Sequence, residues 1–173
     1  MALTESDVTL TESDVTLTES DLLAANNGRL EELFRSSPPG EVPSGPMEGT
    51  VILGAGTGLV QPVAALVRLA VWRGKVFSPE GGYLSNRMGP LDVLAVLARV
   101  APGPSWLDGR ECIVIDYSRT SLVARGVRDE IRLVGTDLYL GVIWLFGSRI
   151  GWFTLRAPAA DSRPGGDRLQ PSG

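Results

Sequence analysis

The chain of 173 residues has no histidine and a single cysteine, Cys112, and both shortages exclude whole classes of site. Without histidine, Ser-His-Asp and Cys-His nucleophilic devices cannot be built, and the usual zinc-ligand sets lack members. One cysteine forms no disulfide within the chain and is typical of a reducing compartment. We therefore expect a cytoplasmic protein whose site uses no metal and no cofactor.

Lysine is almost as scarce, because Lys75 is the sole lysine and every other basic residue is an arginine scattered along the chain. Nucleic-acid binding needs clustered positive charge, so we do not expect a nucleic-acid partner. The first residues, MALTESD, lack the basic segment of an export signal. Residues 51–72 are long enough to cross a membrane, but Gln61, Pro62 and Arg68 interrupt them, which favours a core segment over a membrane span.

An acidic tandem repeat opens the chain. LTESDVT occurs at 3–9 and again at 10–16, and a third copy begins at Leu17. Its apolar residues lie alternately five and two apart, which does not suit a coiled coil. Residues 1–21 are predicted to be a disordered tail, with a lid that orders over a ligand as the alternative.

The rest divides by composition into an arm, one domain and a second tail. Thr18 and Asp21 form a capping pair before an apolar helical segment, and a Pro/Gly linker follows it. We predict a helical arm and linker over 22–48, a single domain over 49–156 and a disordered tail over 157–173.

Within the domain, short apolar runs alternate with turns. The patterns predict strands at 51–53 and 111–117, hairpins at 75–77/83–85 and 139–146/149–155, a buried helix at 62–72, and a helix at 120–134. Residues 91–100 fit a strand or a helix equally well. A two-residue II′ turn is expected at Gly147-Ser148. Both faces of this last hairpin are apolar, so one can line a cavity and the other can pack against a helix or a second subunit.

The segment GAGTGLVQP at 54–62 resembles the GxGTGxxP segment of ferredoxin-NADP reductases. That family places a flavin-binding barrel before the motif and further β-α units after it, and this chain has room for neither. The spacing also departs from GxGxxG at Leu59, and no GK[ST] follows. A glycine turn before a proline-started helix explains the segment without a nucleotide.

Four further motifs occur in order: W-x-GK-x-F at 72–77, DYS-x-TS at 116–121, RDEIR at 128–132 and LYLG at 138–141. This order resembles a group of uncharacterised bacterial proteins and is more distantly similar to the GXWXG-type family, over about residues 29–156. The resemblance implies a small β-barrel with a helix at its side. Together with the residue patterns it predicts a mainly β (α+β) fold, a small antiparallel calycin-like barrel with a buried helix, a covering helix and an N-terminal helical arm. It implies no established reaction.

Candidate catalytic residues are Asp116, Tyr117, Lys75 and Tyr139. Asp116 and Tyr117 end one strand and face opposite sides, so only one of them points into a barrel. A carboxylate in an apolar pocket can act as an acid or base, whereas the alternative pairs Asp116 with Arg125 or Arg128 in a structural ion pair. The RDEIR charges fit a solvated helix face.

Aromatic residues supply the candidate ligand-binding wall: Trp72, Phe77, Trp106, Trp144, Phe146 and Phe153. They fit an ordinary core equally well, but a barrel of this size can hold one small ligand. The leading hypothesis is a cofactor-independent cyclase or isomerase acting on a hydrophobic, polyketide-like molecule. Spirotetramate- and spirotetronate-forming [4+2] cyclases are similar in plan, being small barrels with an N-terminal arm. The alternatives are a carrier of a hydrophobic metabolite and a structural partner protein that dimerises through its hairpin.

Overall fold

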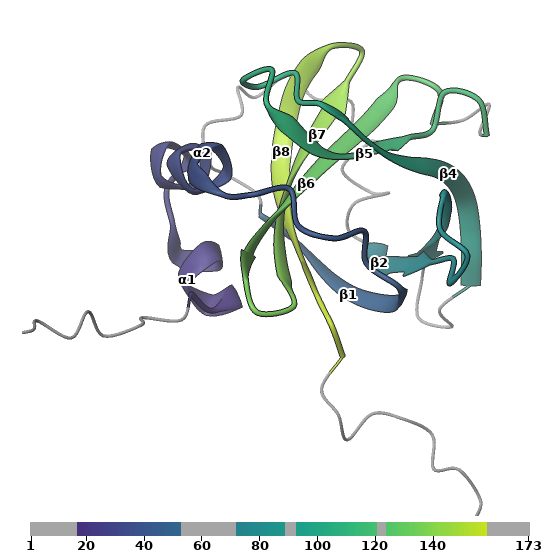
Figure 1. Ribbon diagram of the computed structural model, residues 1–173, viewed down its shortest axis with the longest axis horizontal. Coiled ribbons are helices and arrows are strands. Elements are labelled where there is room, and N and C mark those ends of the chain that lie inside the picture. Colours follow the sequence, from purple (N-terminus) through teal and green to yellow (C-terminus); the bar gives the residue numbers. More distant parts are fainter. Residues whose placement is uncertain (1–16, 53–71, 89–92, 121–123, 159–173) are drawn as a thin grey trace, which may run out of the picture.

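The computed structural model describes residues 17–52, 72–88, 93–120 and 124–158, which form an antiparallel barrel with a helical arm (Figure 1). The strands are β1 Gly45–Ile52, β2 Trp72–Phe77, β3 Tyr83–Met88, β4 Val93–Pro104, β5 Glu111–Asp116, β6 Val127–Gly135, β7 Leu138–Leu145 and β8 Ser148–Arg156. They pair in chain order, and β8 pairs with β1 to close the barrel. The predicted mainly β barrel is confirmed.

Alternation along each strand divides the apolar residues into two cores. The inner core lies on the inner side of the barrel wall and includes Phe77, Ile115, Ile131 and Phe153. The outer core lies between the barrel wall and the arm and includes Trp152. Each of the eight strands contributes buried side chains to the inner core. The final hairpin, formed by β7 and β8, is buried on both faces.

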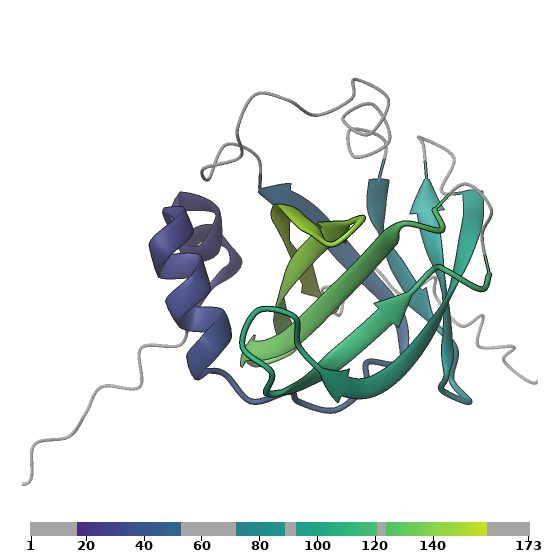
Figure 2. The ribbon, with the colours of Figure 1, turned by 90° about the horizontal axis from the view of Figure 1, so that it is seen from above.

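The arm consists of α1, Glu19–Ala24, and α2, Asn27–Ser36, which stand beside the barrel wall (Figure 2). Thr18 and Asp21 form the expected capping box at the start of α1. Leu30 and Phe34 are fully buried against the outer faces of β6 and β7. The second apolar face of the final hairpin is thus covered by helices of its own chain rather than by a second subunit.

The barrel begins earlier than the sequence analysis placed it. β1 starts at Gly45, inside the segment expected to be linker, and Pro46 lies within it. Pro46 pairs with Val76 of β2, whereas pairing with β8 starts only at Glu48. A proline is tolerated there because its missing N–H faces no second neighbouring strand.

The predicted helix over 120–134 is wrong, because residues 127–135 form β6 between β5 and β7. Val127 and Ile131 fit a helical stripe, but they also fit a strand in which every second residue faces inward. The charges between them are not solvated, since Asp129, Glu130 and Arg132 are all buried. Tertiary pairing therefore overrode the helical pattern.

The last hairpin turns one residue earlier than predicted. Phe146 and Gly147 are its central residues, with φ of 48° and 81°, and Leu145 pairs with Ser148. Positive φ at both positions corresponds to a I′ turn rather than the expected II′ turn. A register shift after Ile143 then places Trp144 on the outer face and Phe153 inside, so the two do not share a face as predicted.

Residues 91–100, which fit either element, are strand where they are described, in β4. Residues 1–16 and 159–173 of the predicted tails, the glycine segment at 54–62 and nearly all of the predicted helix at 62–72 lie outside the described residues. The described end of the first predicted tail is ordered, because α1 begins at Glu19 with Thr18 as its cap. Trp72, the last residue of that predicted helix, begins β2. No helix within the described ranges has the length and apolar character needed to cross a membrane.

Candidate functional site

Four polar side chains meet inside the barrel, and we call them the interior cluster: Lys75, Asn86, Tyr117 and Asp129. Lys75 Nζ lies 2.7 Å from Asp129 Oδ2, 2.7 Å from the Tyr117 hydroxyl and 3.1 Å from Asn86 Oδ1. All four residues are at least 95% buried, with relative exposures of 2% for Lys75, 5% for Asn86, 3% for Tyr117 and 5% for Asp129. They form a charged centre surrounded by apolar residues.

Strand register brings the cluster together. Lys75 of β2 is directly paired with Asn86 of β3, so their inward side chains are neighbours. Tyr117 follows β5 and continues the inward series of Ile113 and Ile115. Asp129 belongs to the inward series of β6, and barrel closure brings it across the interior to Lys75.

Two members of the cluster, Lys75 and Tyr117, have pKa values above their usual ones. Burial lowers the pKa of Lys75, but the Asp129 carboxylate and the Tyr117 oxygen outweigh it, so that the pKa lies above its usual value. Burial is also the largest influence on Tyr117 and raises its pKa to about 12, against the opposing effect of the Lys75 charge. At neutral pH, Lys75 is therefore an ammonium and Tyr117 is a neutral phenol.

Three donors converge on one oxygen of the cluster. Asn86 Oδ1 accepts from Trp72 Nε1 at 3.1 Å and Lys75 Nζ at 3.1 Å, and the Tyr117 hydroxyl lies 3.2 Å away. The Asn86 amide nitrogen donates to the Val96 carbonyl and the Tyr117 oxygen. Asn86 Oδ1 therefore marks a position at which a carbonyl-type oxygen is surrounded by the N–H donors of Trp72 and Lys75 and by the phenol of Tyr117.

Two aromatic rings enclose the ammonium. Lys75 Nζ lies 5.2 Å from the ring centroid of Trp72 and 5.4 Å from that of Phe153, within the range of cation–π attraction. The two rings contact each other edge to face at 5.5 Å. The Phe153 ring lies directly over Gly141, where any added Cβ would be 2.2 Å from it.

This arrangement can stabilise negative charge on an oxygen atom. Buried donors with fixed orientation act strongly on a carbonyl oxygen that gains charge in a transition state, because no water competes with them. The ammonium of Lys75 and the phenol of Tyr117 are such donors. Asp129 is the cluster's carboxylate and keeps Lys75 charged.

Of the four predicted catalytic residues, the structure brings together Lys75 and Tyr117. Asp116 lies on the outer side of β5 and accepts a hydrogen bond from the Ser118 backbone at 2.8 Å. Tyr139 is the second residue of β7 and belongs to the inner core, and its hydroxyl donates to the Glu41 carbonyl at 2.8 Å. Neither takes part in the interior cluster.

The predicted aromatic wall divides in the same way. Trp72 and Phe153 border the cluster, and Phe77 belongs to the inner core. Trp144 and Trp106 contact each other at 5.7 Å on the outer face, and Phe146 is 83% exposed at the hairpin turn. The last three therefore do not line the barrel interior.

Asn86 and Asp129 are the cluster members that the sequence analysis missed. The sequence pattern predicts a solvated helix face for Asp129 and a strand that ends at residue 85, one residue before Asn86. Reading RDEIR with a period of two would have placed Asp129 and Ile131 on one face. No sequence signal distinguishes Asn86 from an ordinary polar strand residue.

The remaining RDEIR charges hold the outer wall together. Arg132 is fully buried and forms two hydrogen bonds with Asp108, at 2.7 and 2.8 Å, and a third with the Phe34 carbonyl. The hydrogen bonds from Arg132 hold the pKa of Asp108 below its usual range. Glu130 accepts from Ser105, the Trp106 backbone and Arg128. These contacts tie the β4–β5 connection and α2 to the barrel.

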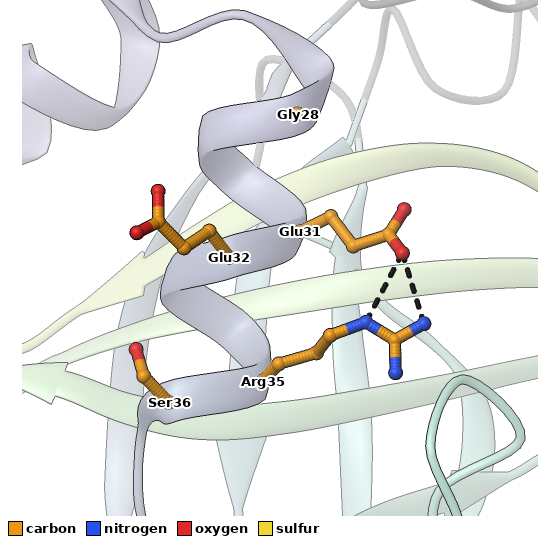
Figure 3. Close-up of a pocket in the computed structure, with 5 residues that line it drawn as sticks. All are labelled: Gly28, Glu31, Glu32, Arg35 and Ser36. Carbon is orange, nitrogen blue, oxygen red and sulfur yellow. Dashed lines mark hydrogen bonds and ion pairs between the residues drawn. The ribbon is translucent and has the colours of Figure 1, made fainter.

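Two hollows on the surface are lined by described residues. One lies along α2, where Glu31 and Arg35 are joined by two hydrogen bonds (Figure 3). Arg149 of β8 also reaches Glu31 at 2.8 Å, so this hollow is bordered by the contacts that attach the arm. The other lies over β1, β2, β3 and β8 and is lined by Trp72 and three arginines.

No protein-family model matches the chain, and no curated protein matches it significantly. Among solved structures, a crystal structure of a protein from Thermomonospora curvata is similar, with a TM-score of 0.57 and 20% identity. The match covers 78% of this chain and 89% of the other. An identity this low shows a shared fold and nothing about function.

Proposed function

We propose that the barrel binds a hydrophobic, polyketide-like small molecule bearing a carbonyl group, and that the interior cluster catalyses its cyclisation or isomerisation without a cofactor. The observation that carries this proposal is the buried Lys75–Asp129 pair with Tyr117 and Asn86 inside an apolar barrel. A buried ion pair seldom improves stability over apolar residues of similar volume. A barrel that keeps one is better explained by a use for its charge.

In a [4+2] cyclisation the cluster would act on the alkene partner. If a conjugated carbonyl oxygen displaced Asn86 Oδ1 as the acceptor of Lys75 and Tyr117, their donation would withdraw electrons from the alkene and lower the barrier to cycloaddition. Two C–C bonds form at the expense of two π bonds, and no proton or electron is gained or lost. The barrel supplies the folded conformation of the chain.

A non-catalytic carrier is the second candidate, and a specific observation favours it. Protein oxygens accept from Lys75 at three places, so the ammonium is satisfied without a ligand. A carrier needs only the apolar interior and would leave its ligand unchanged.

Native mass spectrometry of the purified protein, followed by incubation with a linear conjugated polyene that carries a carbonyl group, separates the two candidates. Catalysis consumes the conjugated absorbance while the mass stays the same, and Lys75→Met and Tyr117→Phe reduce the rate. Tyr139→Phe is the matched control, because it removes a phenol remote from the cluster and should retain the rate. Binding with no absorbance change in any variant would support the carrier, and no binding would exclude both.

A further inference from the structure

The carboxamide of Asn86, in the interior cluster, is hydrogen-bonded at both of its ends. Its oxygen lies 3.1 Å from Trp72 Nε1 and 3.1 Å from Lys75 Nζ. Its nitrogen lies 2.9 Å from the Val96 carbonyl oxygen and 3.0 Å from the Tyr117 hydroxyl. An indole N–H and an ammonium can only donate, and a backbone carbonyl can only accept. The surroundings therefore distinguish the oxygen end of an amide from its nitrogen end.

The acceptor at the nitrogen end comes from a bulge in β4. Leu97 and Ala95 pair with two consecutive residues of β3, Ser85 and Asn86, so Val96 between them opposes no residue of β3. The φ of Val96 is 62°, in the left-handed region that a β-branched residue rarely adopts. Such bulges and strained residues persist where the surroundings impose them, and they are frequent at ligand sites. Here the strained residue supplies the carbonyl that holds the amide nitrogen.

A ligand that replaces the Asn86 carboxamide has to replace its hydrogen bonds at both ends. Asn86 is neutral, so its withdrawal leaves the Lys75–Asp129 ion pair in place. The withdrawal also takes the amide donor away from the partly buried Val96 carbonyl. A ligand that supplies an oxygen alone leaves this acceptor without that donor, which weakens its binding. A group with both a C=O and an N–H restores the bonds at both ends.

We propose that the conjugated carbonyl of the ligand belongs to a primary carboxamide, which takes the place of the Asn86 side chain. This inference rests on the proposed function and narrows its substrate class to conjugated primary amides. The ligand oxygen accepts from Trp72 and Lys75, and the ligand nitrogen donates to Val96. A ketone or an ester has no N–H for Val96. A ring lactam has its N–H on the same side as its C=O, the side on which Tyr117 lies near both amide atoms of Asn86.

Isothermal titration with cinnamamide and benzylideneacetone tests the carboxamide. Both probes carry a conjugated carbonyl on the same styryl group, and the ketone has a methyl group where the amide has its amino group. We expect the wild type to bind cinnamamide roughly tenfold more tightly, because the ketone leaves the Val96 carbonyl without a donor. Asn86→Ala removes the side chain that the ligand has to displace, so it should tighten cinnamamide binding about fivefold or more.

Ser85→Ala is the matched control, because Ser85 precedes Asn86 in β3 and lies on the opposite face of the strand. It should change the binding of either probe by less than about twofold. Equal binding of the two probes to the wild type would overturn the carboxamide and leave the proposed function standing, because both carry a conjugated carbonyl. Cinnamamide binding that Asn86→Ala does not tighten would also overturn it. If neither probe bound to the wild type or to Asn86→Ala, this inference and the proposed function would both fail.

Discussion

Lys75 Nζ lies 2.7 Å from Asp129 Oδ2, although the two residues are 54 positions apart in the chain and belong to β2 and β6. Their side chains are 2% and 7% exposed. The pair therefore joins two non-neighbouring strands through the barrel interior. Removal of the Lys75–Asp129 pair should therefore have separable effects on the free energy of unfolding and on turnover.

Lys75→Met should lower the free energy of unfolding by about 3–5 kcal/mol, because Asp129 is left buried without its cation. The double variant Lys75→Met/Asp129→Leu should recover most of this loss, since it buries apolar groups in place of an uncompensated charge. Urea unfolding at neutral pH measures both values. Recovery of stability without recovery of turnover would identify the pair as functional.

Arg29→Met provides the control, because Arg29 and Glu32 form an ion pair whose side chains are 52% and 67% exposed. Breaking an exposed pair costs about 1 kcal/mol at most. A Lys75→Met variant that loses no more than Arg29→Met would contradict the buried pair.

Alkaline pH should destabilise the fold in a way that depends on Tyr117. Its folded pKa of about 12 lies above its ordinary value of 10.0, so the unfolded chain releases this proton first. The stabilisation is complete below pH 10 and is lost as the pH rises towards 12. Lys75, whose folded pKa is also raised, acts with the same sign.

Urea unfolding between pH 9 and pH 11.5 tests this dependence. Tyr117→Phe should make the loss of stability less steep above pH 10, by about 1.4 kcal/mol per pH unit. Tyr83→Phe, at a residue that is 52% exposed, should leave the slope unchanged. Cys112 adds an earlier decline from pH 9, because burial raises the pKa of its thiol to about 12. If the unfolding free energy fell equally steeply with pH in wild type and Tyr117→Phe, the raised pKa of Tyr117 would be refuted.

The barrel and its arm were largely predictable from the sequence. Of the interior cluster, only Lys75 and Tyr117 were predicted, and Asn86 and Asp129 were not. The alternation in β5 placed Tyr117 and Asp116 on opposite faces, and Lys75 stood out as the sole lysine. Asp129 was missed because Val127 and Ile131 fit two periods, and only pairing with β5 and β7 decides between them. At the last hairpin, the register shift after Ile143 was not predictable from the turn residues, and it separates Trp144 from Phe153 because a shift of one position moves side chains to the other face.

The arm should contribute to stability through its buried side. Leu22 is fully buried and Leu23, its neighbour in α1, is 45% exposed, so the two make a matched pair. Leu22→Ala should cost about 2–5 kcal/mol and Leu23→Ala under about 1 kcal/mol. Thermal or urea unfolding measures the difference. Equal small losses would show that the arm does not pack on the barrel in solution.

The close contact between Gly141 and Phe153 gives the last prediction. A Cβ at residue 141 would lie 2.2 Å from the Phe153 ring, and that ring also makes an edge-to-face contact with Trp72. Gly141→Ala must therefore displace an aromatic side chain that borders the interior cluster. We expect a loss of about 1–3 kcal/mol in unfolding free energy, the usual cost of overpacking a core.

Gly28→Ala is the control for this substitution, because the nearest atom to a new Cβ there is 3.5 Å away and the residue lies in α2. Alanine favours helix over glycine, so Gly28→Ala should raise the free energy of unfolding by up to about 1 kcal/mol. Urea unfolding of both variants gives opposite signs if the contacts are as described. Because Phe153 and Trp72 border Lys75, Gly141→Ala should also reduce ligand binding or turnover, whereas Gly28→Ala should not. A Gly141→Ala protein as stable as wild type would mean that the Phe153 ring does not lie over β7.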